Sequence, residues 1–195
     1  ALLEAWRGAL PEVLYREMIE TQVLPRLAAQ LTRYRPKADP PPYTWLHPWL
    51  PLLPAPGLAP LFPQLRHKLA GAIGEADAAG ADPAARAVVA PWQRVFDAGS
   101  WAALVNRHVL PKLAHVLSLL VVNPAAQELG PLEAVLAWAP LLSADQLYTL
   151  LAHGFFPPWL ATLRAWLRQQ PDFQEVSQWY LGWKSLLQER APRLL

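Results

Sequence analysis

Residues 100–122 read SWAALVNRHVLPKLAHVLSLLVV, and this stretch indicates the fold class. Alanine and leucine dominate it, and both residues favour helix over strand. Ser100 is a suitable N-cap and Asn123-Pro124 a suitable stop, so the stretch is predicted to form one helix. Because valine and isoleucine are also sparse in the rest of the chain, an all-α fold is predicted for the whole.

Further helix boundaries are marked by proline, glycine and capping residues. The predicted boundaries are a start at Pro11 for a helix that runs through Glu20, a start or kink at Pro25 for a helix that stops before Pro36, a capping box of Ser143 and Gln146 for a helix that Gly154 closes, and a start at Pro171-Asp172 for the last helix.

Three short motifs recur in the same order along the chain. VLPRLAAQL at 23–31 returns as VLPKLAHVL at 109–117, WLPLL at 49–53 returns as WAPLL at 138–142, and Phe62-Pro63 returns as Phe156-Pro157. The offsets are 86, 89 and 94 residues. This order predicts an internal duplication and a helical-repeat, α-solenoid-like domain of paired helices. Coincidence in a chain rich in leucine and proline is the alternative.

The 195 residues are predicted to form a single domain, with residues 1–73 and 84–195 as its two halves. The small polar residues 74–83 are expected to be an exposed loop between them. The proline-rich connector 37–60 carries many large apolar side chains, so we expect it to pack on the domain. The first residue is Ala1 rather than methionine, and we expect the chain to be a piece excised from a longer protein.

Composition argues against several classes of function. Hydrophobic residues make up 53% of the chain and charged residues 16%, which predicts a real core. The chain has no cysteine and therefore no disulfide or thiolate metal site. The long uncharged stretch 40–65 contains nine prolines, and so many missing N–H groups are incompatible with a membrane-spanning helix. The net charge is only +2, with both signs mixed along the chain, so no strong nucleic-acid surface is expected.

Motifs for catalysis, phosphate binding and metal binding are missing, so the chain is predicted to be no enzyme and to hold no cofactor or metal. His108 and His115 are seven residues apart but have no third ligand at a matching spacing. His47 is expected to fix the connector by a hydrogen bond. Glu12, Glu17 and Glu20 around Arg16 are expected to form ordinary ion pairs on a helix face.

Ten tryptophans are the unusual feature of the composition, and most of them should lie in the core. Some are expected to reach a partner-binding surface, because aromatic residues are enriched at interfaces. The segment WYLGWK at 179–184 is the main candidate, since one helix face cannot easily bury all its large side chains. The candidate partner-binding residues are Trp159, Trp166, Trp179, Tyr180, Trp183 and Lys184.

Four segments resemble successive blocks of one family. They are WLHPWLPLL at 45–53, residues 90–124 from APWQRVFDAGSW to VVNP, HGFFPPWLATLRAWL at 153–167 and EVSQWYLGWKSLL at 175–187. These blocks are similar to the GC-rich-sequence DNA-binding-factor-like (GCFC) domain of the septin- and tuftelin-interacting proteins. The similarity follows the same order over most of the chain from about Trp45, and is weaker before it.

The resemblance implies a nuclear pre-mRNA splicing factor that acts when the intron-lariat spliceosome is disassembled. In that family a separate G-patch segment, absent from this chain, recruits a DEAH-box RNA helicase. The role implied for this chain is a non-catalytic scaffold that binds spliceosomal proteins. The alternative is direct RNA or DNA binding through Arg107, Lys112, Arg164, Arg168 and Lys184.

Overall fold

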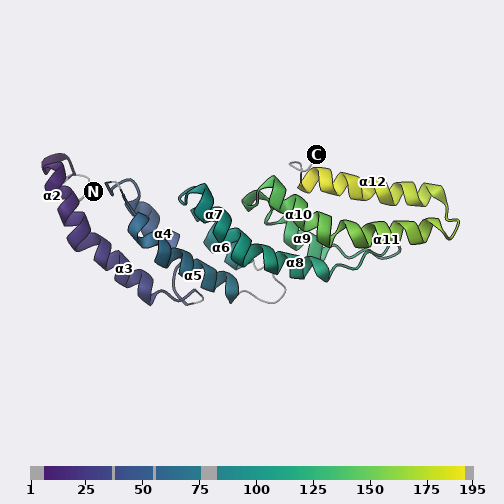
Figure 1. Cartoon of the computed structure of the whole chain (residues 1–195), viewed down its shortest axis with the longest axis horizontal. Coiled ribbons are helices and arrows are strands. Elements are labelled where there is room, and N and C mark those ends of the chain that lie inside the picture. The colour runs from purple at the N-terminus through teal and green to yellow at the C-terminus, as the bar shows by residue number, and fades with distance from the viewer. Residues whose placement is uncertain (1–6, 37, 55, 76–82, 192–195) are drawn as a thin grey trace. The chain divides into compact units, whose positions relative to one another are not determined.

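The computed structural model describes residues 7–36, 38–54, 56–75 and 83–191, which form helices, turns and loops but no strand (Figure 1). The all-α prediction is therefore confirmed. The α-helices are α2 (Glu12–Met18), α3 (Leu24–Arg33), α4 (Pro42–Leu46), α5 (Phe62–Gly74), α6 (Pro83–Val89), α7 (Ala98–Leu104), α8 (Leu110–Ser118), α9 (Gly130–Leu136), α10 (Ala144–Gly154), α11 (Phe156–Leu167) and α12 (Phe173–Arg190). The π-helical turns are η1 (Ile19–Val23) and η5 (Val105–Val109), and the 3₁₀ turns are η2 (His47–Trp49), η3 (Ala59–Leu61), η4 (Ala90–Trp92) and η6 (Ala139–Leu141).

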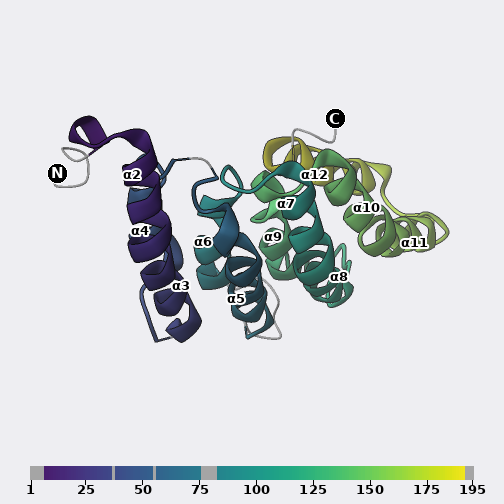
Figure 2. The same ribbon diagram turned by 60° about the vertical axis from the view of Figure 1, so that its left-hand side comes forward.

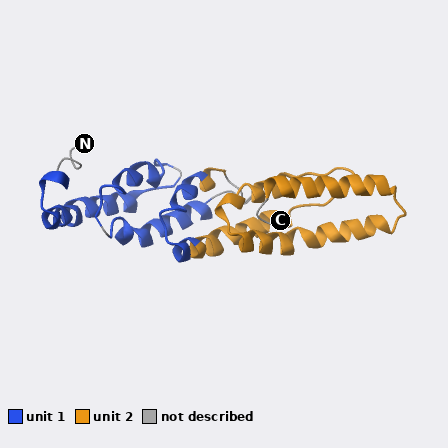
Figure 3. Cartoon of the chain, turned by 90° about the horizontal axis from the view of Figure 1, so that it is seen from above, with its two compact units in different colours: residues 1–75, 87–101 blue, residues 76–86, 102–195 orange. Residues whose placement is uncertain are grey.

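The chain divides into two compact units (Figure 3). Unit 1 comprises residues 1–75 and 87–101, and unit 2 comprises residues 76–86 and 102–195. The boundary therefore falls within α6 and again within α7. The predicted single domain with halves 1–73 and 84–195 stays a prediction, and most of the loop expected at 74–83 lies outside the described residues.

Unit 1 is built on the contact between α3 and α5. Leu31 of α3 and Leu69 of α5 are fully buried, as are Leu46 of α4 and Trp92 of η4. The connector 37–60 packs on this core through Leu46 and other apolar side chains, as predicted, and the short helix α4 lies within it.

Unit 2 is built around α8, which contacts α9 and α10, while α10 also contacts α11. Leu113 and Leu117 of α8 and Leu151 of α10 are fully buried. Gly154 ends α10 where it meets α8: a Cβ there would lie 2.7 Å from Leu117 Cδ2 and 3.0 Å from Leu117 Cγ. The close approach of two helices therefore requires glycine at this position.

Two prolines lie within continuous helical segments because a π-helical turn precedes each of them. The segment from Glu12 to Arg33 runs through α2, η1 and α3 as one rod (Figure 2), and Pro25 does not open a separate helix. Leu24 N–H donates to Ile19 O, five residues back. Proline has no N–H and its ring clashes with the carbonyl four residues earlier, so the wider turn lets the helix continue. The predicted end at Glu20 is therefore wrong.

The same local structure recurs 86 residues later at Pro111, where Leu110 N–H donates to Val105 O. Likewise α5 and α11 each begin with Phe-Pro, at the motif repeated with an offset of 94 residues. The third echo differs, since Trp49 ends a 3₁₀ turn whereas Trp138 precedes one. The duplication and the solenoid-like arrangement stay predictions.

Most predicted helix boundaries are confirmed. Helix α2 begins after Pro11, α3 stops at Arg33, and α10 has the capping box, in which Ser143 Oγ accepts from Gln146 N–H and Gln146 Oε1 accepts from Ser143 N–H. At the last helix Asp172 is the N-cap, and its carboxylate accepts from Gln174 N–H.

Two expectations about residues 100–122 are wrong. The N-cap of α7 is Asp97 rather than Ser100, because Asp97 Oδ1 accepts from Ser100 N–H at 2.8 Å. Ser100 Oγ instead accepts from Arg66 at 3.1 Å. The helix also ends at Ser118, and the segment that follows as far as Leu129 is not helical.

His47 was expected to fix the connector by a hydrogen bond, but its buried Nε2 has no hydrogen-bond partner. The ring instead packs edge-on against Trp92, with 4.6 Å between centroids, and also contacts Tyr43. Burial lowers the pKa of His47, so the ring is held in its neutral form and packs as an aromatic group.

No helix among the described residues is long and apolar enough to cross a membrane.

Substitution of two glycines tests the packing of α8 against α10. We expect Gly154→Ala to lower the free energy of unfolding by about 1–3 kcal/mol, because the buried Leu117 cannot move away from the new methyl group. Gly182→Ala in α12 is the matched control. No atom lies within 4 Å of its new methyl group, so this substitution should stabilise the chain by about 0.5–1 kcal/mol. Urea unfolding followed by circular dichroism measures the free energy of unfolding of both variants. Equal effects would contradict the close contact between Gly154 and Leu117.

The capping assignment at α7 predicts a dependence on pH. The hydrogen bonds from Ser100 hold the pKa of Asp97 below its ordinary value of 3.8. A lowered folded-state pKa means that the ionised cap stabilises the chain above the unfolded-state pKa and that this contribution is lost as pH falls through the folded-state value. Asp97→Ala should therefore lower Tm near neutral pH by more than Ser100→Ala. Its deficit should shrink in acid, and a deficit that stays constant from pH 6 to pH 2 would refute this role.

Candidate protein-interaction surface

Helices α11 and α12 lie side by side (Figures 1 and 3). Aromatic side chains join the two helices. Trp159 of α11 and Trp179 of α12 stack with 5.2 Å between ring centroids and 8° between planes. The edge of Trp166 meets Trp179 at 5.9 Å, and Trp183 packs against Phe155 at 5.1 Å. Ring contacts of this kind favour one rotation of α12 about its axis.

The structure separates the six predicted partner-binding residues into two groups. Trp159 and Trp183 are only 8% and 6% exposed, so both belong to the core. The expectation that the Trp183 side chain faces outward is wrong, because it lies beneath Trp179 and against Phe155. Trp166 and Trp179 are half-buried, while Tyr180 and Lys184 are exposed. Partner binding through any of the six stays a prediction.

An apolar stripe lies on the outer side of α12, and only its members Tyr180 and Lys184 were recognised from the sequence. Phe173 is 70% exposed, Tyr180 47% and Leu181 55%. These residues have the spacing i, i+7 and i+8, which places them on one helix face together with Lys184. We call Phe173, Tyr180, Leu181 and Lys184 the outer stripe of α12. The heptad spacing of Phe173 and Tyr180 was the signal available in the sequence.

A groove of about 740 Å³ lies next to these helices in unit 2. Its walls include Trp166 and Trp179, and its rim is polar. The groove is lined by Asn123, Pro124, Ala125, Thr162, Ala165, Trp166, Gln169, Glu175, Gln178 and Trp179. The indole N–H of Trp179 is buried without a hydrogen-bond partner. An apolar wall with a polar rim is typical of a site that takes a peptide or a partner side chain.

Among the described titratable side chains of unit 2, Glu175 lines this groove and the histidines do not. His108 is half-buried, and its pKa is lowered by burial and by the neighbouring Arg107. His115 is exposed. Throughout the described ranges, no three His, Asp or Glu side chains are grouped closely enough to hold a metal ion. The described lining of this groove therefore offers a contact surface for a partner.

The five cations of the nucleic-acid alternative lie on different elements of unit 2. Arg107 belongs to η5, Lys112 to α8 and Lys184 to α12, while Arg164 lies in the last turn of α11 and Arg168 is its C-cap. Acidic side chains lie among them in the sequence of α12, including Glu175 and Glu189. Elsewhere the expected helix-face pair is present, since Arg16 contacts Glu12 at 2.8 Å.

The burial of Trp183 leads to a stability prediction. Trp183→Ala removes a core indole beside Phe155 and Trp179, and should lower the free energy of unfolding by about 3–5 kcal/mol. Tyr180→Ala on the outer stripe should cost below about 1 kcal/mol. Urea unfolding of the two variants measures the difference, and a small loss for Trp183→Ala would place that side chain at the surface after all.

Comparison with known proteins adds sequence relationships to this geometry. Residues 1–163 match the family described as GC-rich sequence DNA-binding factor-like protein. The chain is 39% identical over 188 residues to tuftelin-interacting protein 11 of Danio rerio, which covers 96% of the chain and 22% of that protein. It is 34% identical to the Gallus gallus protein of the same name and 35% to that of Bos taurus, each over 190 residues and 97% of the chain. The chain thus spans about a fifth of the length of these relatives, covering 23% and 22% of the latter two.

Proposed function

The chain belongs to the GC-rich sequence DNA-binding factor-like protein family, and from this premise we propose that it is the protein-interaction domain of a pre-mRNA splicing factor. Its role is to hold that factor on spliceosomal proteins in the nucleus while the intron-lariat spliceosome is disassembled. The DEAH-box helicase of this step is recruited by a G-patch outside the chain. The name of the relatives states that those proteins interact with tuftelin.

The observation that carries the proposal is the outer stripe of α12. Three large apolar side chains on one helix face are exposed, and Lys184 lies beside them. Contiguous exposed apolar surface is costly in water unless another macromolecule covers it. Tyr180 also contacts the buried Trp159 at 5.9 Å, so the exposed stripe rests on a rigid aromatic layer. A rigid support lowers the entropy lost when a partner binds.

A charge placed on this stripe tests the proposal. Full-length protein with Phe173→Glu and Leu181→Glu should recover at least tenfold less spliceosomal protein and small nuclear RNA from nuclear extract, because two desolvated carboxylates oppose apolar burial. Both residues are exposed, so the fold should be retained, which circular dichroism checks. Tyr148→Glu is the matched control on α10, since Tyr148 is also an exposed aromatic residue of unit 2.

Unchanged recovery with the double variant would contradict the outer stripe as the contact surface. Recovery of no splicing component by the unaltered protein would contradict the function itself. If ribonuclease treatment abolished recovery, the chain would bind RNA rather than protein. That binding should then weaken steeply as the salt concentration rises.

A further inference from the structure

A second groove, in unit 1, differs from the α12 surface in its charge. It has a volume of about 590 Å³ and lies along one face of α3. The groove is lined by Arg26, Ala29, Gln30, Arg33, Tyr34, Asp39, Pro40 and Trp45. The half-buried ring of Trp45 provides an apolar wall, and the two arginines are exposed. We call this site the α3 groove.

The two arginines of the α3 groove are free to bind a ligand. Neither Arg26 nor Arg33 makes an ion pair or a side-chain hydrogen bond with any described residue. They are seven residues apart on α3, so they lie on the same helix face at a separation of about 10 Å along the axis. Two unpaired guanidinium groups in one groove attract anions, and each can bind a carboxylate in bidentate fashion.

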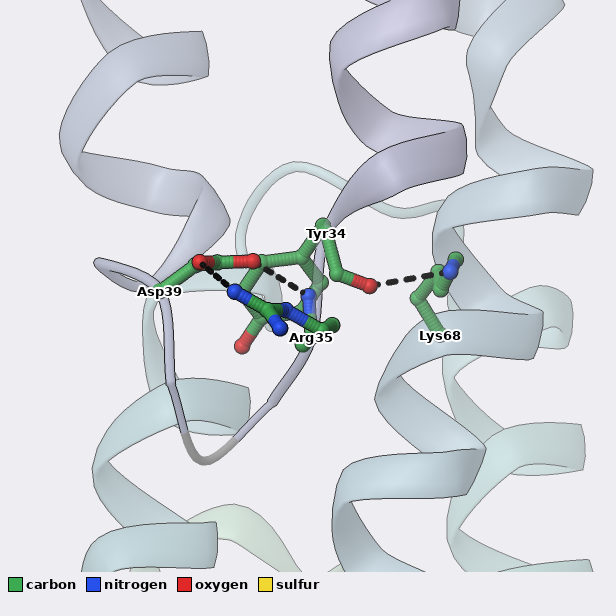
Figure 4. Close-up of polar contacts among 4 residues, drawn as sticks. All are labelled: Tyr34, Arg35, Asp39 and Lys68. Atoms are coloured by element: carbon green, nitrogen blue, oxygen red, sulfur yellow. Dashed lines mark hydrogen bonds and ion pairs between the residues drawn. The ribbon is translucent and has the colours of Figure 1, made fainter.

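The single carboxylate of the groove is already neutralised. Asp39 accepts from Arg35 N–H at 2.7 Å and lies 3.5 Å from the Arg35 guanidinium (Figure 4). The same figure shows Lys68 donating to Tyr34 O at 2.9 Å, and Lys68 also donates to Thr32 O. Arg35 and Lys68 therefore hold the C-terminal end of α3 in place. The uncompensated charge that remains in the groove belongs to Arg26 and Arg33.

Tyr34 adds a buried polar group to the groove. Its side chain is only 3% exposed, and its hydroxyl has no hydrogen-bond partner. Burial, reinforced by Asp39 and Glu75, raises the pKa of Tyr34, so the hydroxyl stays protonated and keeps its capacity to donate. An unpartnered buried donor is costly, and native structures usually supply a partner. The hydroxyl is closed to solvent, so a ligand in the groove contacts it only if the Tyr34 ring moves.

We propose that the α3 groove binds an acidic peptide segment of a partner protein. Arg26 and Arg33 each take one carboxylate, and Trp45 covers the apolar part of the segment. In the polyproline II conformation three residues make one turn with a rise of about 9 Å, so side chains three positions apart point to the same side. The recognised pattern is therefore two acidic residues separated by two others. We choose an acidic peptide as the ligand because its carboxylates complement the charge of the two arginines.

A peptide fits the α3 groove better than a nucleic acid. A strand of nucleic acid carries a phosphate at every nucleotide and needs a continuous row of cations. The groove has two free cations about 10 Å apart, which are too few for the closely spaced phosphates of a strand. This inference concerns a different surface from the outer stripe of α12, and its test with a synthetic peptide succeeds or fails independently of recovery from nuclear extract.

Fluorescence polarisation with full-length protein tests the proposal. The probes are a labelled twelve-residue peptide with Glu-x-x-Glu at its centre, its Gln-x-x-Gln counterpart and a twelve-nucleotide single-stranded RNA. We expect the glutamate peptide to bind at least tenfold more tightly than the glutamine peptide. Arg26→Glu with Arg33→Glu should remove this preference, and the double variant should instead prefer a Lys-x-x-Lys peptide. Both arginines are exposed, so the fold should persist, as circular dichroism checks.

Arg164→Glu with Arg168→Glu is the matched control, because it changes the net charge equally at two exposed residues at the C-terminal end of α11. This pair should leave peptide binding within twofold of the unaltered protein. Equal losses from both pairs would reduce the effect to overall charge and overturn the proposal. Equal binding of the two peptides would also overturn it. So would an RNA that bound the unaltered protein more tightly than the glutamate peptide did and that no longer bound the variant with Arg26→Glu and Arg33→Glu.

Discussion

The parallel stacking of Trp159 on Trp179 is the contact on which the surface chemistry of unit 2 depends. Two flat rings separated by 5.2 Å leave little freedom for α12 to turn about its axis. Once Trp179 faces α11, Trp183 follows it into the core, one turn further along the helix. Phe173, Tyr180 and Leu181 must then face outward, although they are as apolar as core residues. The outer stripe is thus a geometric consequence of the buried stack.

Proline is the second constraint, since the chain contains 22 of these residues and still folds as helices. Many of the described helical elements place a proline within their first two positions, where the missing N–H costs nothing. Pro25 and Pro111 instead lie within continuous helical segments, and there a π-helical turn accommodates the proline ring. Such turns are frequent at functional sites. In this chain the π-helical turns are explained by the space that the proline ring requires.

The two grooves use different chemistry for recognition. The groove beside α12 offers indole rings and amide side chains, which suit an apolar partner surface with a few hydrogen bonds. The α3 groove offers two unpaired guanidinium groups, which suit carboxylates. Apolar burial supplies most of the affinity of an interface, whereas charge complementarity supplies most of its specificity and association rate. A chain with both kinds of groove suits the proposed role of binding partners of different character.

The sequence by itself determined the all-α class, the capping box of Ser143 and Gln146, the Asp172 cap and the end of α3 before Pro36, because these features depend on residues within one helical turn. It predicted Ser100 as the cap of α7, whereas the structure has Asp97, since both residue types are good N-caps and only the path of the chain separates them. The sequence could not decide which aromatic residues of α12 are buried, because both faces of that helix are apolar. The pairing of Arg35 with Asp39, which leaves Arg26 and Arg33 free, is visible only in the folded chain. Tertiary structure decided these points because packing against a neighbouring helix selects one of several faces that the sequence alone leaves equivalent.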